Sequence, residues 1–91
     1  MVTAIVLANV QRGQVNRVAE SLADQEGIAE VYSVSGRYDL IAIIRVKDND
    51  AMANLVTDAI ANTDGITHTE TMLAFQAFSR HDLDSMFGIG E

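Results

Sequence analysis

The residues best suited to bind a small polar molecule lie in one short segment, Gly36-Arg37-Tyr38-Asp39, between two runs rich in Val and Ile. Two such runs separated by a short glycine-bearing loop predict a β-hairpin. Gly36 can adopt the positive φ that such a loop requires. Tyr38 and Asp39 would then present an aromatic ring, a hydroxyl and a carboxylate at the end of a strand. An alternative stays open, in which Asp39 only caps the turn and Tyr38 covers part of the core.

Groups suited to catalysis or metal binding are few. The sequence contains no Cys, and its only histidines, His68 and His81, lack the spacing of a metal-binding pair. It has neither a nucleophile elbow nor a glycine-rich phosphate-binding loop. Glu70 would share a strand face with His68, which allows an acid–base pair, but a solvated pair at a sheet edge is the more common arrangement. We therefore expect no enzyme activity, no metal and no cofactor.

Composition argues against several classes of protein. The 91 residues include 6 basic and 13 acidic side chains, and the resulting net charge of −7 is unfavourable for contact with nucleic-acid phosphates. No apolar run reaches the roughly 18 residues of a membrane-spanning helix. Residues 1–10 are apolar but lack the basic start and the cleavage site of a signal peptide. We expect a cytoplasmic protein that contacts neither nucleic acid nor a membrane directly.

The chain repeats itself, since the glycine-bearing segment 25–28 matches segment 63–66. Each half contains a strand, a helix, a glycine stop and a second strand. Apolar residues recur at helical spacing within 15–23 and within 52–60, which predicts one apolar stripe on each helix. The start of the second helix is expected to gain capping side chains and negative charge from Asp48, Asn49 and Asp50. The glycine of each matching segment is expected to end a helix in the left-handed conformation.

Two such halves joined by a hairpin predict the ferredoxin-like α+β fold, in the order β-α-β-β-α-β. Segments 3–8 and 40–44 are apolar on both faces and should form central strands, whereas 28–35 and 68–79 carry polar residues suited to edges. The four-stranded antiparallel sheet then has the order 4-1-3-2, with both helices on one face. The other face would stay apolar and bare, so we expect a second copy to cover it, as in a dimeric α/β barrel. Residues 1–80 would form this domain, and 81–91 a C-terminal tail.

Two segments carry a resemblance to a known family. They are Ser-Gly-Arg-Tyr-Asp-Leu at 35–40 and Asp-Gly-Ile-Thr-His-Thr-Glu-Thr-Met-Leu at 64–73. In type and spacing they resemble the effector-binding domain (RAM type) of the Lrp/AsnC, or feast/famine, transcription regulators. Members usually carry an N-terminal helix-turn-helix, whereas the first strand here is expected to begin at Val2. The sequence thus resembles the stand-alone form of the domain, which lacks a DNA-binding domain of its own.

This resemblance implies a sensor of an amino acid or a related metabolite. It implies a homo-oligomer in which dimers assemble into an octamer or decamer, with the ligand between dimers and its α-amino and α-carboxyl groups at Gly36, Tyr38 and Asp39. Thr69 and Thr71, which share a strand face, would provide polar contacts on the opposite wall, although β-propensity alone also explains them. Regulation would pass through oligomerisation or through full-length Lrp/AsnC regulators as partners.

Two other functions stay open. Dimeric ferredoxin-like domains include small monooxygenases, so an enzyme could act in the same cavity between subunits. Only Arg37, Arg45 and His68 are candidates for such chemistry in this sequence. The second alternative is a module that forms hetero-oligomers with regulators and binds no small molecule. If a ligand does bind, Leu55 and Ala59 on the second helix could line a pocket for its side chain.

Overall fold

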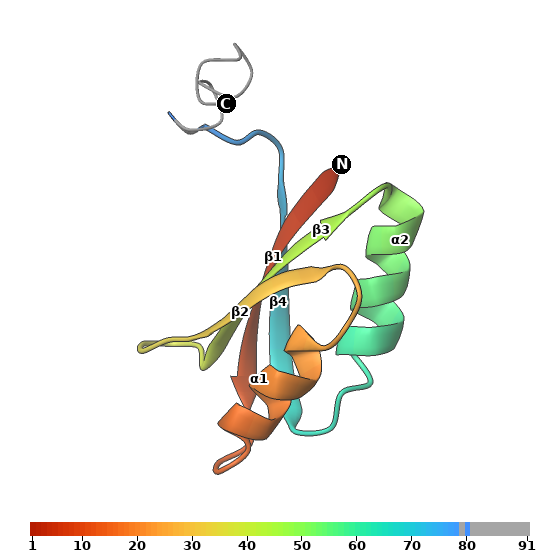
Figure 1. The fold of residues 1–91 in the computed structure, drawn as a ribbon. Coiled ribbons are helices and arrows are strands. Elements are labelled where there is room, and N and C mark those ends of the chain that lie inside the picture. The colour runs from red at the N-terminus through yellow and green to blue at the C-terminus, as the bar shows by residue number, and fades with distance from the viewer. Residues whose placement is uncertain (79, 81–91) are drawn as a thin grey trace.

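The computed structural model describes residues 1–78 and residue 80, and its four strands form one antiparallel sheet (Figure 1). The predicted tail, 81–91, lies outside the described residues. Along the chain the elements are β1 (Val2–Val10), α1 (Val15–Ala23), β2 (Ile28–Ser33), β3 (Leu40–Val46), α2 (Asn49–Asn54), its π-helical continuation η1 (Leu55–Ile60) and β4 (Ile66–Ala74).

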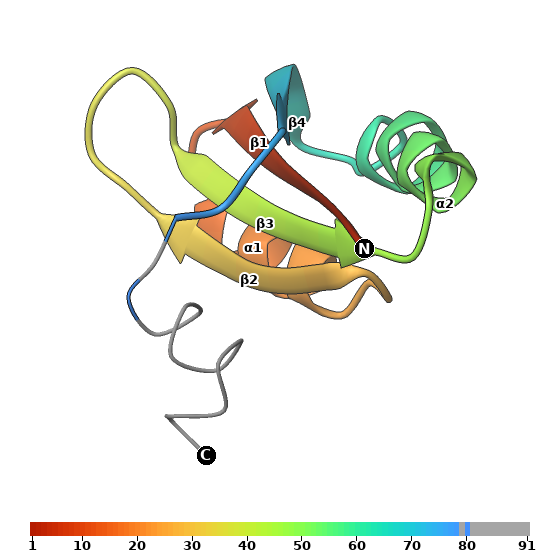
Figure 2. The same cartoon turned by 90° about the horizontal axis from the view of Figure 1, so that it is seen from above.

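The sheet order is β2-β3-β1-β4, and Figure 2 shows the strands side by side in this order. This is the predicted order 4-1-3-2 read from the other edge, so the ferredoxin-like fold is confirmed. The predicted strand 68–79 is wrong at both ends. β4 begins at Ile66 and stops at Ala74, because Ala74 pairs with Thr3 and β1 itself begins at Val2.

Both helices lie on the same side of the sheet (Figure 1). Burial alternates along the two central strands, as the period of two in a strand requires. The buried sheet residues are Ala4, Val6, Ala8, Ile28, Leu40, Ala42 and Ile44, and the helices add Val18, Leu22, Met52, Leu55 and Ile60. The predicted stripe on α1 is confirmed at its centre, but Ala23 at its end is exposed. No helix in the described part of the chain is long and apolar enough to cross a membrane.

The second helix changes from α to π geometry at Leu55. The hydroxyl of Thr57 donates to the carbonyl of Ala53, the group that would accept the Thr57 N–H in an α-helix. Leu55 and Ile60 are five residues apart and both buried, which one wider π turn allows. Apolar spacing alone predicts an ordinary helix here, because it does not register how one hydroxyl competes for a carbonyl.

The expected caps are only partly correct. Of the three residues expected to cap α2, Asp48 is the cap, since its Oδ1 accepts a 2.8 Å hydrogen bond from an N–H of the first turn. Gly27 and Gly65 both have φ of +97°, but they directly precede β2 and β4, and α1 ends instead at Asp24 in a right-handed conformation. A Cβ at Gly27 would lie 2.9 Å from Cγ1 of Val46. The helix-cap prediction is therefore wrong, and this glycine lets a loop approach the sheet closely.

Candidate functional site

The hairpin loop, residues 34–39, is fastened to the end of β1. The backbone N–H of Asp39 donates to the carbonyl of Ala8 over 3.0 Å, and its Oδ2 accepts from the N–H of Val10 over 2.8 Å. The side-chain amide of Asn9 donates to the carbonyl of Arg37 over 2.9 Å. Three successive residues of a central strand therefore hold the loop, and its shape is set before any ligand arrives.

The tip of this loop is open. Gly36 has φ of +114°, which confirms that the loop needs a glycine-like conformation there, and a Cβ at this position would meet no atom within 4 Å. The backbone N–H groups of 35–38 form no hydrogen bond with any residue that the structure describes. Unused N–H groups in a turn are suited to binding an anion such as a carboxylate.

Tyr38 extends from the loop to the edge strand β4. Its hydroxyl donates a 2.5 Å hydrogen bond to Oε1 of Glu70, and its ring stacks on His68 with centroids 6.5 Å apart and planes inclined by 17°. The hydrogen bond to the Glu70 carboxylate is the main cause that raises the pKa of Tyr38, and the positive charge of Arg37 opposes it. His68 and Glu70 do share one face of β4, but the recorded partner of Glu70 is Tyr38.

Thr69 and Thr71 lie on the other face of β4. The register pairs Thr69 with Ala8 and Thr71 with Val6, and both of these partners are buried beneath the helices. Residues paired across a sheet share a face, so the two threonines are on the helix side. Tyr38 lies on the opposite side with Glu70. Within one chain, the two predicted walls of the ligand site are therefore separated by the sheet.

The sheet face away from the helices, the open face, has an apolar centre. Its central side chains are Ile5, Leu7, Ile41, Ile43 and Met72, which the strand register places together. The first four are partly exposed, and Met72 is 44% exposed. No helix in the described residues covers this face. The sequence-based expectation of an apolar second face is thus confirmed.

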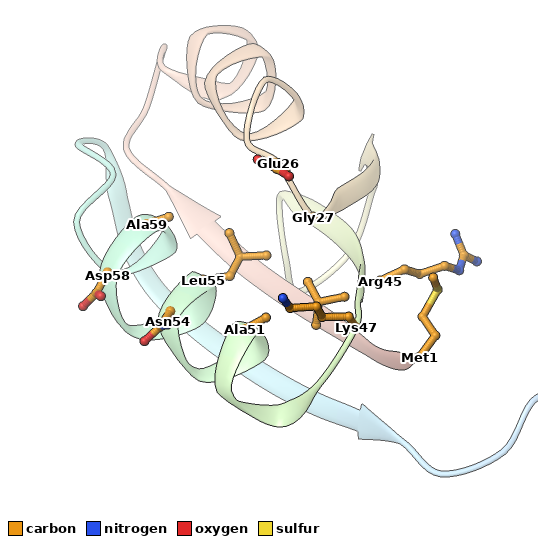
Figure 3. A pocket seen from close by; sticks show the side chains of 11 residues that line it. Met1, Glu26, Gly27, Arg45, Lys47, Ala51, Asn54, Leu55, Asp58 and Ala59 are labelled. Atoms are coloured by element: carbon orange, nitrogen blue, oxygen red, sulfur yellow. The ribbon is translucent and has the colours of Figure 1, made fainter.

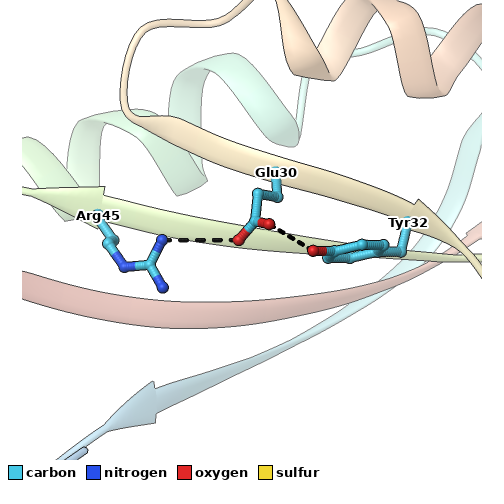
Figure 4. Close-up of polar contacts among 3 residues, drawn as sticks. All are labelled: Glu30, Tyr32 and Arg45. Carbon is cyan, nitrogen blue, oxygen red and sulfur yellow. Dashed lines mark hydrogen bonds and ion pairs between the residues drawn. The ribbon is translucent and has the colours of Figure 1, made fainter. Parts of the chain in front are cut away.

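A polar group borders the open face along β2. Figure 4 shows Arg45, Glu30 and Tyr32 in a row on the side away from the helices. An Arg45 nitrogen lies 3.8 Å from Oε1 of Glu30, and the hydroxyl of Tyr32 donates to Oε2 of the same carboxylate. This hydrogen bond is the main cause that raises the pKa of Tyr32. Arg45, one of three candidates for chemistry, is therefore engaged in a cross-strand ion pair.

A cavity of about 640 Å³ lies between the α2–η1 helix and the adjoining ends of β2 and β3 (Figure 3). Leu55 and Ala59, which the sequence suggested for a ligand's side chain, line this cavity together with Gly27 and Val46. In Figure 3 the Lys47 side chain extends toward α2. β3 runs from the hairpin loop at one end to this cavity at the other. The Tyr38–Asp39 turn and the cavity are thus separate places in one subunit.

Sequence reasoning missed two features of these places. The partnership of Tyr38 with Glu70 has no local signal, since the residues are 32 positions apart. The sequence did contain a signal for the cavity wall at Gly27, namely a glycine just before a strand. That glycine was interpreted as the end of a helix. Among residues 1–78 and 80, no group of three or more His, Cys, Asp or Glu side chains is arranged to hold a metal ion.

The comparisons of this sequence with known proteins point to transcription regulators. A family model described as the Lrp/AsnC ligand binding domain matches residues 3–84. The HTH-type transcriptional regulator FL11 of Pyrococcus horikoshii is 34% identical over 73 residues, which cover 80% of this chain and 48% of the regulator. The chain therefore spans about half the length of the curated relatives it matches.

Solved structures agree with the fold. The protein TTHA0845 of Thermus thermophilus is 42% identical with a TM-score of 0.82, covering 88% of this chain and 100% of that one. The transcriptional regulator NMB0573 of Neisseria meningitidis, solved as an L-Met complex, has a TM-score of 0.77 at 12% identity. That match covers 87% of this chain and 53% of the regulator, and at this identity it shows the fold alone.

Proposed function

The chain belongs to the Lrp/AsnC ligand binding domain family, a family of transcription regulators, and from this premise we propose that it senses an amino acid or a related small metabolite. The observation that carries the proposal is the hairpin loop. It presents unused N–H groups next to a carboxylate, on a backbone that β1 holds in place. A zwitterion offers one anion and one cation, and this loop has a complementary group for each.

Asp39 and the turn form the first wall of the proposed site. Oδ2 of Asp39 is occupied by the N–H of Val10, while no described residue donates to Oδ1. Oδ1 is therefore placed to accept from an ammonium group, and the N–H groups around Gly36 to donate to a carboxylate. The Tyr38 ring, which is only half buried, provides an apolar side.

Thr69 and Thr71 form the second wall, and in this proposal a neighbouring copy contributes them. The supporting geometry is their position on the helix side of the sheet, away from Tyr38 of the same chain. Their hydroxyls can donate to a carboxylate or accept from an ammonium group. The complete site would thus exist only where subunits meet.

The proposed assembly begins with two open faces packed against each other. The support is the apolar centre of that face, together with Phe75 and Phe78, which follow β4 and are 95% and 83% exposed. Large exposed apolar groups of this kind mark interaction surfaces. Further association through the hairpin loops, to an octamer or decamer, would bring the two walls of the site together.

Regulation of transcription would need a DNA-binding unit besides the described domain. The described residues contain two helices separated by strands, not a helix-turn-helix, and the net charge is −7. Such a unit could belong to a full-length Lrp/AsnC regulator that forms a hetero-oligomer with this domain. The affinity of that regulator for DNA would then respond to the effector through the interface that it shares with this domain.

Calorimetric titration with each standard amino acid, starting with L-methionine as the probe, tests the sensor function. We expect one to bind at millimolar concentration or below, and Asp39→Asn to weaken it roughly ten- to a hundredfold, because a hydrogen bond to a charged group contributes about 1.5–3 kcal/mol. Thr71→Val should also weaken binding. Asp24→Asn removes the same charge from an exposed position at the end of α1 and is the matched control.

Two results would contradict this proposal in different ways. If a ligand binds and neither Asp39→Asn nor Thr71→Val weakens it, the site lies elsewhere. If no amino acid binds at millimolar concentration, a module that only forms hetero-oligomers replaces the sensor.

A further inference from the structure

Tyr38 connects the two segments that the proposed function assigns to the ligand. Its backbone belongs to the hairpin loop, and its hydroxyl donates to Glu70 on β4 over 2.5 Å. Glu70 stands between Thr69 and Thr71 in the sequence, with its side chain on the opposite face of the strand. The bond thus joins the Tyr38 side chain to the face of β4 opposite the threonines.

We propose that Glu70 is a positioning residue of the effector site, which holds the Tyr38 ring in the orientation that receives the ligand. The inference rests on the proposed function and adds to it a residue that itself makes no ligand contact. A short hydrogen bond to an ionised acceptor is stronger than a neutral one, so one such bond can select one rotamer of a partly exposed side chain.

Two contacts together define the orientation of the ring. Glu70 fixes the hydroxyl, and His68, two residues earlier on the same strand face, stacks on the ring plane. Without them the ring of Tyr38 would sample several rotamers, because its own backbone segment is an open loop. A ligand would then have to order the ring on binding, which lowers affinity.

The rest of the loop does not depend on Glu70. Asp39 and Asn9 hold the loop backbone to β1 through three hydrogen bonds that do not involve β4. Loss of the Glu70 side chain should therefore release the ring while the fold and the turn persist. A role in positioning can thus be separated from a role in folding.

The test compares Glu70→Ala with Glu70→Gln, with Glu20→Gln as a matched control at an exposed position on α1. The first readout needs no ligand. In a Tyr32→Phe background Tyr38 is the only tyrosine, and its ionisation can be followed by ultraviolet absorbance as pH rises. Glu70→Ala should lower the titration midpoint of Tyr38 toward the ordinary tyrosine value, and Glu20→Gln should leave it unchanged.

The second readout is the affinity for L-methionine, or for whichever amino acid the calorimetric screen finds to bind. We expect Glu70→Ala to weaken binding roughly three- to tenfold, the cost of ordering one side chain. Glu70→Gln keeps an oxygen that can accept from the phenol, so it should restore most of the affinity. Circular dichroism of each variant would show whether the fold is retained.

The outcomes separate this proposal from the function on which it rests. If the parent protein binds an amino acid and Glu70→Ala binds it equally well, the positioning role is wrong while the sensor function stands. An unchanged Tyr38 titration in Glu70→Ala would likewise overturn it. If the parent protein binds no amino acid, the sensor function fails first and the positioning role fails with it.

Discussion

The backbone N–H of Val10 donates a 2.8 Å hydrogen bond to Oδ2 of Asp39, which joins the end of β1 to the hairpin loop. The pairing of β1 with β3 ends where Ala8 meets Leu40, so the N–H of Val10 lies beyond the ladder and has no strand partner there. The carboxylate assigned to the ligand's ammonium group therefore also satisfies a backbone donor. Oδ2 has this structural role, and the proposed function uses Oδ1 for the ligand.

Substitution of Asp39 should separate these two roles. Asp39→Ala removes the acceptor of a partly buried N–H and should lower the free energy of unfolding by about 1–3 kcal/mol. Asp39→Asn keeps an acceptor oxygen and should lower the free energy of unfolding by less than about 1 kcal/mol, while it still weakens ligand binding. Urea unfolding followed by circular dichroism measures both. Equal losses for the two variants would mean that the negative charge, and not the acceptor, holds the loop.

The open face should hold the chain in an oligomer. Light scattering at micromolar concentration should give a mass of at least two chains. Ile43→Lys places a charge at the centre of this face without touching the buried core, and it should produce monomers. Ala53→Lys, at an exposed position on α2, adds the same charge and should leave the oligomer intact. A parent protein that is monomeric would rule out the proposed assembly.

Alkaline pH should weaken the fold through Tyr32 and Tyr38. The pKa of each is raised in the folded protein by a hydrogen bond to a carboxylate, Glu30 or Glu70. Each bond thus contributes stability that is fully present below the unfolded tyrosine pKa of about 10 and is lost as pH rises through the higher folded value. Because both side chains are solvent-accessible, the loss should be small.

Titration of single-tyrosine variants tests this assignment. In a Tyr38→Phe background, Glu30→Gln should lower the midpoint of Tyr32. The same substitution in a Tyr32→Phe background should leave Tyr38 unaffected, because Glu30 is bonded to the other tyrosine. A midpoint of Tyr32 at the ordinary value in the parent protein would mean that this hydrogen bond does not persist in solution.

Two glycines with positive φ should respond differently to alanine. A Cβ at Gly27 would lie 2.9 Å from Val46 and 3.0 Å from Leu55, whereas one at Gly36 would meet nothing within 4 Å. Gly36→Ala should cost only the strain of the left-handed region, about 1–2 kcal/mol, and Gly27→Ala should cost clearly more because the core must shift as well. Thermal unfolding of the two variants provides the comparison. Equal costs would show that the core near Gly27 yields easily.

The isolated domain should not bind DNA. Its net charge is −7, and charge repulsion opposes contact with the phosphates of DNA, whatever the base sequence. Fluorescence anisotropy with duplex DNA at moderate salt should show no saturable binding by the pure protein. Saturable binding that weakens with added salt would contradict this expectation and would point to a basic surface formed only in the assembly.

Local chemistry in the sequence determined much of this fold. Strands that are apolar on both sides must lie at the centre of a sheet, and this rule alone placed β1 and β3 correctly between β2 and β4. The positive φ of Gly36 and a side-chain cap among residues 48–50 also followed from single residue types. Such features are predictable because their energetics involve neighbours along the chain.

The tertiary structure decided what depends on register and on distant partners. A period of two puts Thr69 and Thr71 on one face of β4 and Glu70 on the other, but only the pairing with β1 determines which face meets the helices. The same pairing brings Glu70 to Tyr38, where a hydrogen bond joins residues 32 positions apart. Gly27 was expected to end a helix but instead lies close to Val46, and this contact too depends on a distant segment of the chain. Contacts between distant segments leave no periodic trace in a single sequence, because each partner is compatible with many others until the sheet has formed.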